Sequence, residues 1–481
     1  MPPHNLSDFV KAYDVRGLVP EQLDVDVAWA LGAAFAEVII NRENGTGCVI
    51  GHDMRATSPE LSQAFGAGVA SRGIDVTHIG LASTDGLYFA SGHLDLAGAM
   101  FTASHNPAAY NGIKLCRPGA RPVGQDSGLA DVRDLAQELL DGTAELRHED
   151  EGKTDERDLL ADYAAFLRGL VDLSGIRPLK VVVDAGNGMG GHTVPAVLEG
   201  KAGMPSLPLD VVPLYFELDG TFPNHEANPL EPANLVDLQA AVVKHGADIG
   251  LAFDGDADRC FVIDERGEAV SPSAITALIA TREVAREVAA GTPASDVSIV
   301  HNVITSAQVP EVIASLGAKA VRTRVGHSFI KGEMARANAV FGGEHSAHYY
   351  FRDFWFADTG MLAAMHVLAA LGEQSEPLSK TMTAYSAYFE SGEINSTVDD
   401  QAAKTALVRE WAHDKGVEFD ELDGLTLTHG GGEGDPMWWL NLRASNTEPL
   451  LRLNVEAADA DTMAAIRDDV LSLVRGTARG N

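Results

Sequence analysis

The segment Asp254-Gly255-Asp256-Ala257-Asp258-Arg259 carries three carboxylates at alternate positions between two short apolar stretches. Oxygen ligands spaced this closely suit a hard cation such as Mg²⁺ or Ca²⁺. An acidic surface turn would give no compensation for the mutual repulsion of the three groups. We therefore interpret Asp254, Asp256 and Asp258 as a metal-binding loop.

An EF-hand calcium loop is the main alternative for this segment. Its acidic ligands occupy positions one, three and five, and a glutamate occupies position twelve, where this chain has Glu265. Its sixth position requires glycine, however, and this chain has Arg259 there. The flanks 249–253 and 260–263 also have the apolar pattern of strands. The pattern therefore argues against an EF-hand.

Ser104 lies in the segment Thr102-Ala103-Ser104-His105-Asn106-Pro107, directly after the apolar run 96–101. The Asn-Pro pair indicates a turn, so the hydroxyl is expected at the end of a strand, where α/β proteins often place chemistry. Serine and threonine also bond local backbone amides at turns, and this segment alone fits that role well. The glycines of a Gly-x-Ser-x-Gly hydrolase motif are missing, which disfavours a hydrolase nucleophile.

Near the C-terminus, Arg443-Ala444-Ser445-Asn446-Thr447-Glu448-Pro449 separates two predicted strands. Its guanidinium, hydroxyl and amide groups can surround the oxygens of a phosphate. The same residue types are common in hairpin loops for turn reasons alone. From the residues themselves, both interpretations stay open.

The segment Gly342-Gly343-Glu344-His345-Ser346-Ala347-His348 combines a carboxylate, a hydroxyl and two imidazoles. Such groups can hold the hydroxyls of a sugar. The spacing of His345 and His348 would also suit a metal, but no third soft ligand is nearby. We therefore favour hydrogen bonding or a structural role for both histidines.

The charge balance of the chain limits its partners. The 69 Asp and Glu residues exceed the 36 Lys and Arg residues and give a formal net charge of -33, so nucleic acid is not an expected partner. An anionic small molecule would need cationic groups gathered locally. The three cysteines have no metal-binding spacing, and no long apolar stretch or signal peptide is evident, so we expect a cytoplasmic protein without a membrane partner.

Short apolar runs alternate with helical patterns, which is typical of α/β layering. A chain of 481 residues predicts roughly three or four domains. The polar segments 145–158 and 372–378 are the expected linkers. Two paired strands at 437–442 and 450–455 before a helix near 459–475 predict a smaller α+β terminal domain. The other expected strands are 48–51, 96–101, 181–184, 249–253, 260–263 and 297–300, and the expected helices are 59–72 and 273–290.

Taken together and in this order, the four segments resemble the signature of the α-D-phosphohexomutase superfamily over essentially the whole chain. The resemblance implies an α/β fold of four domains around a central cleft: three similar α/β domains with mixed sheets and a smaller α+β C-terminal domain. We place these domains at residues 1–156, 157–266, 267–378 and 379–481. They would carry, in turn, the phosphoserine, metal, sugar-binding and phosphate-binding loops.

The resemblance also implies roles for individual residues. Ser104 resembles the phosphoserine that completes a Mg²⁺ site with the three aspartates. The implied catalytic residues are Ser104, His105, Lys114, Arg16, Arg259 and His327, with Lys114 or His327 as proton acceptor. The implied substrate-binding residues are Glu344 and Ser346 for sugar hydroxyls, and Arg443, Ser445, Asn446 and Thr447 for the non-reacting phosphate.

The implied reaction moves a phosphoryl group between Ser104 and a hexose through a hexose 1,6-bisphosphate. The segment around Glu344 looks most like that of phosphomannomutases, including those that accept glucose phosphates. Phosphoglucosamine mutases, the main alternative, usually carry Glu-Gln-Ser-Gly-His there and an aspartate in place of His327. His345 and Ala347 depart from the commonest mannose/glucose pattern and leave the fine sugar preference open. A sugar-phosphate-binding or calcium-binding protein without turnover is the alternative outside the enzymes.

Overall fold

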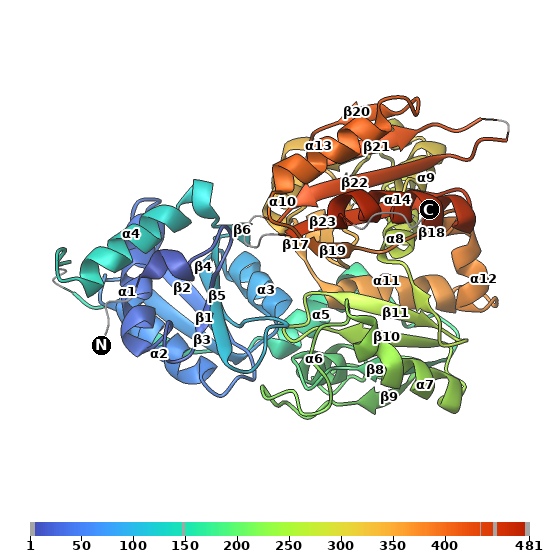
Figure 1. The fold of residues 1–481 in the computed structure, drawn as a ribbon. Coiled ribbons are helices and arrows are strands. Elements are labelled where there is room, and N and C mark those ends of the chain that lie inside the picture. The colour runs from blue at the N-terminus through green and yellow to red at the C-terminus, as the bar shows by residue number, and fades with distance from the viewer. Residues whose placement is uncertain (1–4, 147–149, 433, 446–449, 477–481) are drawn as a thin grey trace. The chain divides into compact units, whose positions relative to one another are not determined.

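The computed structural model describes residues 5–146, 150–432, 434–445 and 450–476 (Figure 1). The chain forms two compact units, each made of two stretches of sequence. Met1–Val270 and Ser346–Thr381 form the first unit, and Ser271–His345 and Met382–Asn481 form the second. No helix in the described ranges combines the length and the apolar character needed to span a membrane.

The first sheet is mixed, with strand order β1-β5-β4-β2-β3-β7 and β6 beside β5. Its strands β2, β3, β4 and β7 run parallel, while β5 pairs antiparallel with both β1 and β4. The strands are β1 (Val15–Leu18), β2 (Gly47–His52), β3 (Asp75–Leu81), β4 (Ala97–Phe101), β5 (Tyr110–Arg117), β6 (Arg121–Pro122) and β7 (Thr154–Glu156). The helices of this region are α1 (Val25–Phe35), α2 (Ser58–Ala70), α3 (Thr84–Leu94) and α4 (Leu129–Leu140).

An apolar core fixes this sheet against its helices. Phe65 of α2 contacts both Phe35 of α1 and Phe101 of β4, with ring centroids 5.9 and 5.5 Å apart. Burying rings of this size stabilises the layers through area and edge contacts. The end of β4, and hence the start of the Ser104 turn, is therefore held rigidly.

The second sheet has the order β12-β11-β10-β8-β9 and is also mixed. β8 pairs in parallel with β9 and β10, and β10 and β11 form an antiparallel hairpin whose strands are fully buried. Its strands are β8 (Leu179–Asp184), β9 (Leu209–Leu214), β10 (Ile249–Phe253), β11 (Cys260–Asp264) and β12 (Ala269–Val270). Its helices are α5 (Leu160–Leu170), α6 (Gly190–Val197) and α7 (Val236–His245). The same unit contains β16 (Tyr349–Phe351), β17 (Ala357–Asp358) and the buried helix α11 (Gly360–Gly372).

In the third α/β region, β13 pairs in parallel with β14 and β15, and β16 pairs antiparallel with β17. The elements of this region in the second unit are β13 (Ser298–Asn302), β14 (Lys319–Thr323), β15 (Phe341–Gly343), α8 (Pro272–Ala289), α9 (Gln308–Ser315) and α10 (His327–Ala337). The short helix α12 (Leu378–Met382) follows α11 in the chain.

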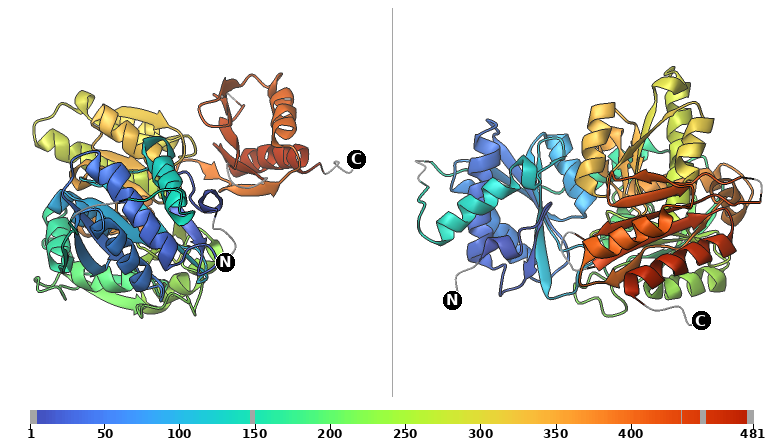
Figure 2. Two further views of the ribbon diagram at one scale, coloured as in Figure 1. Left: turned by 90° about the vertical axis from the view of Figure 1, so that its left-hand side faces the viewer. Right: turned by 45° about the horizontal axis from the view of Figure 1, so that its top comes forward.

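The C-terminal sheet is antiparallel, with the order β18-β23-β22-β21-β20 and β19 beside β23. Helices α13 and α14 cover one face of it (Figure 2), and Val408 and Val470 of these helices enter one core with the strands. The elements are β18 (Phe389–Glu390), β19 (Ile394–Thr397), β20 (Glu418–Asp420), β21 (Leu425–His429), β22 (Trp438–Ala444), β23 (Leu450–Ala457), α13 (Gln401–Ala412) and α14 (Ala460–Arg475).

The structure confirms every strand and helix predicted from the sequence, each within a few residues. The segment 145–158, expected to be a linker, also contains β7. This strand pairs with Val76–His78 of β3 and so extends the first sheet at its edge.

Candidate active site

Two tight turns bring Ser104 to the aspartate loop. Ser104 follows β4 with a left-handed backbone (φ 49°), and the aspartates lie in the turn that joins β10 to β11. A Cβ atom on Gly255 would lie only 2.3 Å from the carbonyl oxygen of Ser104. Only glycine permits this approach, so Gly255 lets the two turns touch.

The hydroxyl of Ser104 points at the aspartate loop. Its Oγ donates to Asp254 Oδ2 at 2.8 Å and lies 3.2 Å from Nδ1 of His105. Ser104 is 5 % exposed and Asp254 is fully buried. Two segments 150 residues apart in the sequence thus form one polar site within the first unit.

Arg259 joins Asp254 to His105. Its guanidinium donates to Asp254 Oδ2 at 2.9 Å and to Nδ1 of His105 at 2.6 Å. Burial, together with the positive charges of Arg259 and Arg16, lowers the pKa of His105 to about 2. His105 is therefore a neutral acceptor at Nδ1.

Lys114 of β5 bridges the other two aspartates. Its Nζ lies 2.6 Å from both Asp256 Oδ2 and Asp258 Oδ2. Burial alone would lower the pKa of Lys114, but the two carboxylates raise it well above its ordinary value. Lys114 thus places a positive charge beside Asp256 and Asp258, and its expected role as proton acceptor stays a prediction.

The aspartate loop fits a divalent cation. Ligand atoms of Asp254, Asp256 and Asp258 all lie within 4.8 Å of one another. Among the described residues, the buried Oδ1 atoms of Asp256 and Asp258 have no hydrogen-bond partner. Burial and the neighbouring carboxylates also raise the pKa of Asp254, against the opposing effect of Arg259. An oxygen-only donor set with unsatisfied buried oxygens suits Mg²⁺.

Arg16 of β1 supports the Ser104 turn from the first sheet. Its guanidinium donates to Asn106 Oδ1 at 2.7 Å and pairs with Asp14 at 2.6 Å. The first unit therefore gathers the following predicted residues around one site: Arg16, Ser104, His105, Lys114, Asp254, Asp256, Asp258 and Arg259.

Two residues at the start of α3 belong to this site but carry no motif in the sequence. Thr84 donates from Oγ1 to Asp256 Oδ2 at 2.5 Å and from its backbone N–H to the Asp256 carbonyl at 3.0 Å. The neighbouring Asp85, which is fully buried, accepts from Tyr163 and Thr359 at 2.7 Å each. The start of α3 thus anchors the aspartate loop.

His348 also reaches the aspartate loop, although the sequence favoured only hydrogen bonding or a structural role for it. Its Nε2 lies 3.6 Å from Asp258 Oδ1, and its backbone forms a bridge with Arg259. With Asp358 it makes a second group of possible metal ligands around Asp258. On its other side, Nδ1 of His348 lies 3.0 Å from Ser346 Oγ.

The remaining residues of the sugar-binding prediction lie in the second unit. Glu344, 3 % exposed, accepts at 3.2 Å from the backbone N–H of Gly326, the residue before His327. His345 lies 3.2 Å from Ser273 Oγ. The structure therefore brings Glu344 close to the start of α10, where His327 begins the helix.

Arg443 is the last residue but one of β22, and its guanidinium pairs with Glu393 at 2.7 Å. Glu393 also faces Arg452 of β23 at 3.5 Å. The backbone N–H of Ser445 donates to Leu450 at 2.9 Å. Asn446 and Thr447 lie outside the described residues.

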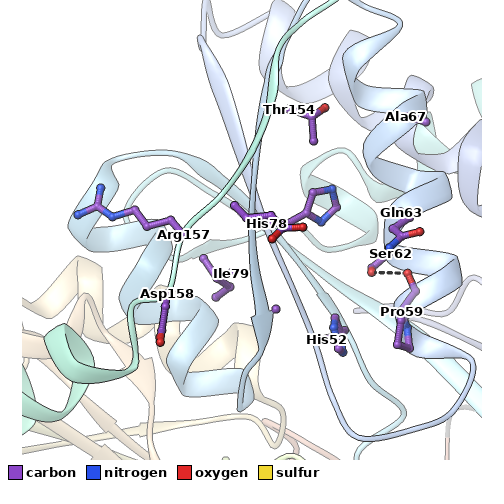
Figure 3. Close-up of a pocket in the computed structure, with 12 residues that line it drawn as sticks. His52, Pro59, Ser62, Gln63, Ala67, His78, Ile79, Thr154, Arg157 and Asp158 are labelled. Carbon is purple, nitrogen blue, oxygen red and sulfur yellow. Dashed lines mark hydrogen bonds between the residues drawn. The ribbon is translucent and has the colours of Figure 1, made fainter. Parts of the chain in front are cut away.

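A separate cavity of about 760 Å³ lies on the first sheet, between α2, β3 and the segment that contains β7 (Figure 3). His52, Ser62, His78 and Thr154 are among its lining residues, and Arg157 points away from its centre in the close-up. The lining residues include neither Ser104 nor the aspartates. The cavity is therefore not part of the site described above.

Four family models match the chain in order. They describe the α/β/α domains I, II and III of phosphoglucomutase/phosphomannomutase, at residues 8–138, 161–267 and 271–388, and the C-terminal domain of the same enzymes, at residues 393–473. The four domains follow the order expected from the sequence, with three α/β domains before the antiparallel one.

Curated relatives and a solved structure resemble the chain over nearly its full length. A protein of Xanthomonas campestris pv. campestris described as "Phosphohexose mutases" is 40 % identical over 97 % of this chain and 99 % of its own length. A phosphomannomutase of Salmonella montevideo is 38 % identical over 98 % of this chain and 99 % of its own length. A crystal structure of a phosphoglucomutase/phosphomannomutase family protein from Burkholderia thailandensis superposes with a TM-score of 0.84 at 30 % identity, over 99 % of each chain.

Proposed function

The chain belongs to the α-D-phosphohexomutase superfamily and is a phosphohexomutase, and we propose that it interconverts mannose 1-phosphate and mannose 6-phosphate through phosphorylated Ser104. The observation that carries this proposal is the buried contact of 2.8 Å between Ser104 Oγ and Asp254. A hydroxyl at this position can both receive and release a phosphoryl group beside a cation site. Glucose phosphates are proposed as further substrates.

In the proposed cycle, phosphorylated Ser104 gives its phosphoryl group to a free hydroxyl of a hexose monophosphate. The product is a hexose 1,6-bisphosphate, which then returns its other phosphoryl group to Ser104. Phosphoryl transfer requires little covalent chemistry beyond alignment and neutralisation of charge. Mg²⁺, when bound by Asp254, Asp256 and Asp258, would withdraw negative charge from the transferred group.

The residues around Ser104 divide the remaining tasks. Arg259 orients Asp254 and His105, and Lys114 supplies a fixed positive charge beside Asp256 and Asp258. We propose that proton transfer with the sugar hydroxyl involves either Lys114, as the sequence indicates, or a histidine imidazole. The candidate histidines are His327, from the sequence, and His348, whose Nε2 lies 3.6 Å from Asp258.

The substrate assignment rests on the second half of the chain. We propose that Glu344 and Ser346 bind sugar hydroxyls, because a buried carboxylate and a hydroxyl can accept and donate to a hexose. We propose that the non-reacting phosphate is bound by Arg443, Ser445, Asn446 and Thr447. Mannose is favoured by the sequence of the Glu344 segment and by the similarity of the chain to the phosphomannomutase of Salmonella montevideo.

Two measurements test this function. Purified enzyme with Mg²⁺ and a trace of hexose 1,6-bisphosphate is supplied separately with mannose 1-phosphate, glucose 1-phosphate and glucosamine 6-phosphate. We expect turnover to be fastest on the mannose compound. A preference for the amino sugar would instead identify the enzyme as a phosphoglucosamine mutase. Peptide mapping should find phosphate on Ser104, and Ser104→Ala should abolish turnover. Phosphate on another residue, or an active Ser104→Ala enzyme, would refute the mechanism.

A further inference from the structure

A single buried arginine binds the backbone of the Ser104 turn at four points. The guanidinium of Arg55 donates through one terminal nitrogen to the carbonyls of Ser104 at 2.9 Å and Asn106 at 2.7 Å. Through the other it donates to the carbonyls of Pro107 at 3.0 Å and Tyr110 at 2.9 Å. Ser104, Asn106 and Pro107 lie in no helix or strand, and Tyr110 begins β5, so one side chain joins the carbonyls of the turn to the start of the next strand.

Arg55 is itself fixed from two directions. Asp53, 1 % exposed, accepts from the backbone N–H of Arg55 at 2.9 Å and from its Nε at 3.2 Å. The guanidinium carbon also lies over the ring of Phe222, 5.2 Å from its centroid. A Cβ on Gly220 would approach the Arg55 Cα to 2.8 Å, so the second domain packs closely here. Arg55 therefore has little freedom to move.

The conformation that Arg55 holds is one that the chain would not adopt alone. Ser104 has a φ of 49°, in the left-handed region that L-residues other than glycine avoid. Such a conformation persists only when its surroundings enforce it. In this conformation the hydroxyl of Ser104 points at Asp254. The same turn therefore carries the carbonyls that Arg55 binds and the hydroxyl that points at Asp254.

We propose that Arg55 is a positioning residue for phosphoryl transfer, which fixes the Ser104 turn so that the hydroxyl meets the aspartate loop. The inference rests on the proposed function of Ser104. Arg55 has no assigned contact with the transferred group and acts through the backbone alone. A lysine cannot replace it, because an ammonium group offers donors from one point whereas the guanidinium fork offers five in a plane.

The test compares Arg55→Lys with Arg72→Lys in the full-length enzyme. Arg72 is a matched control, since it is a buried arginine of the same domain, 6 % exposed, and it pairs with Glu37 at 3.4 Å. We expect Arg55→Lys to lower kcat about 100-fold, the size of effect that a small misplacement of a reacting group produces. KM and the Mg²⁺ concentration for half activity should change by less than about threefold, because the groups that bind substrate and metal are untouched. Arg72→Lys should keep kcat close to that of the wild type.

A second measurement does not depend on activity. Hydrogen exchange of the backbone amides between residues 104 and 110 should be faster in Arg55→Lys and unchanged in Arg72→Lys. An Arg55→Lys enzyme with normal kcat and normal exchange would overturn the inference, and so would an equal loss of kcat in both variants. If Arg55→Lys does not fold, Asp53→Asn replaces it, because Asp53 fixes the same guanidinium. If the wild type has no mutase activity, the proposed function fails, while the exchange measurement still decides whether Arg55 holds the turn.

Discussion

The Ser104 region and the Arg443 region carry opposite surpluses of charge. Around Ser104, the three aspartates of the loop contact two cations, Lys114 and Arg259, which leaves one negative charge in excess. Around Arg443, two arginines share Glu393, which leaves one positive charge in excess. The aspartate loop is buried and the Arg443 group is partly buried, and a ligand of the opposite sign would compensate the surplus charge of either. The first region is thus prepared for a cation and the second for an anion.

On the proposed function, this difference would allow one enzyme to treat the two phosphates of a hexose 1,6-bisphosphate differently. The group that reacts requires fixed geometry, and the Ser104 region provides it through short contacts between buried side chains. The group that does not react requires only attraction and a few donors. On the proposed function, a variant in the first region should therefore change kcat or metal affinity, and a variant in the second should change KM.

The largest expected effect follows from removing a charge of the aspartate loop. Asp256→Asn leaves Lys114 with one carboxylate and takes one ligand from the cation. We expect the Mg²⁺ concentration for half activity to rise about 100-fold or more, since even partners behind a metal ligand are worth 10- to 100-fold in metal affinity. Titration of activity with Mg²⁺ measures it. Asp210→Asn, an exposed carboxylate of the same domain, is the control and should behave as wild type. If the Mg²⁺ titration of Asp256→Asn were normal, Asp256 would not be a ligand of the activating cation, and the proposed cation site would be wrong.

A smaller effect is expected in the Arg443 region. Arg443→Gln removes the positive surplus, and the loss of charged hydrogen bonds to phosphate should raise KM for the hexose phosphate by about 10- to 100-fold. The value of kcat should fall much less. Arg452→Gln, which changes the other partner of Glu393, should have a weaker effect on KM. If Arg443→Gln lowered kcat and left KM unchanged, the two regions would not differ as described.

The buried carboxylate of Glu456, for which no ion pair is seen among the described residues, allows the effect of an uncompensated charge to be tested by pH. Glu456 accepts from Trp439 Nε1 at 2.6 Å and from the Ala307 N–H at 2.9 Å, and burial raises its pKa above the ordinary value. A raised pKa in the folded state means that this group favours folding below about pH 4.5 and that this contribution is lost as the pH rises through the folded-state pKa.

We therefore expect Glu456→Gln to stabilise the chain by about 1 kcal/mol at pH 8 and to have little effect near pH 4. Thermal unfolding of both proteins at the two pH values measures it. Asp258 gives the opposite case: burial alone would raise its pKa, but Lys114, His348 and Arg259 together outweigh the burial and lower it. A Glu456→Gln variant that is destabilised at pH 8 would show that the donors around Glu456, which include Ser306, compensate its charge more than its burial costs.

Local residue patterns predict the parts of the Ser104 region, whereas only the family resemblance indicates that Ser104 and the aspartates form one site. The apolar runs around Asp254-Gly255-Asp256 indicate the β10–β11 hairpin because fully buried strands have this pattern. No local pattern indicates that Ser104 meets Asp254, because that contact depends on the packing of two domains. The roles of Arg55 and Thr84 could not be predicted from the sequence either, because a buried polar residue that bonds to a distant segment produces no periodic pattern. A polar residue between an apolar run and a helix start, as at Arg55, is the closest signal available.

The smallest expected effect concerns a second left-handed residue. Ala347 has a φ of 65° and is fully buried, whereas the same backbone region at Ser104 is held by Arg55. Because glycine adopts this region without strain, Ala347→Gly should stabilise the chain by about 0.5 to 1 kcal/mol. Ala364→Gly within α11 is the matched control, and should destabilise by a similar amount because glycine is unfavourable in a helix. Thermal unfolding of the two variants should thus shift in opposite directions. A shift in the same direction would mean that packing of the Ala347 methyl group outweighs the backbone strain at this residue. Left-handed residues in this enzyme would then be stabilised in two ways, by packing of their own side chain as at Ala347 and by hydrogen bonds from an arginine as at Ser104.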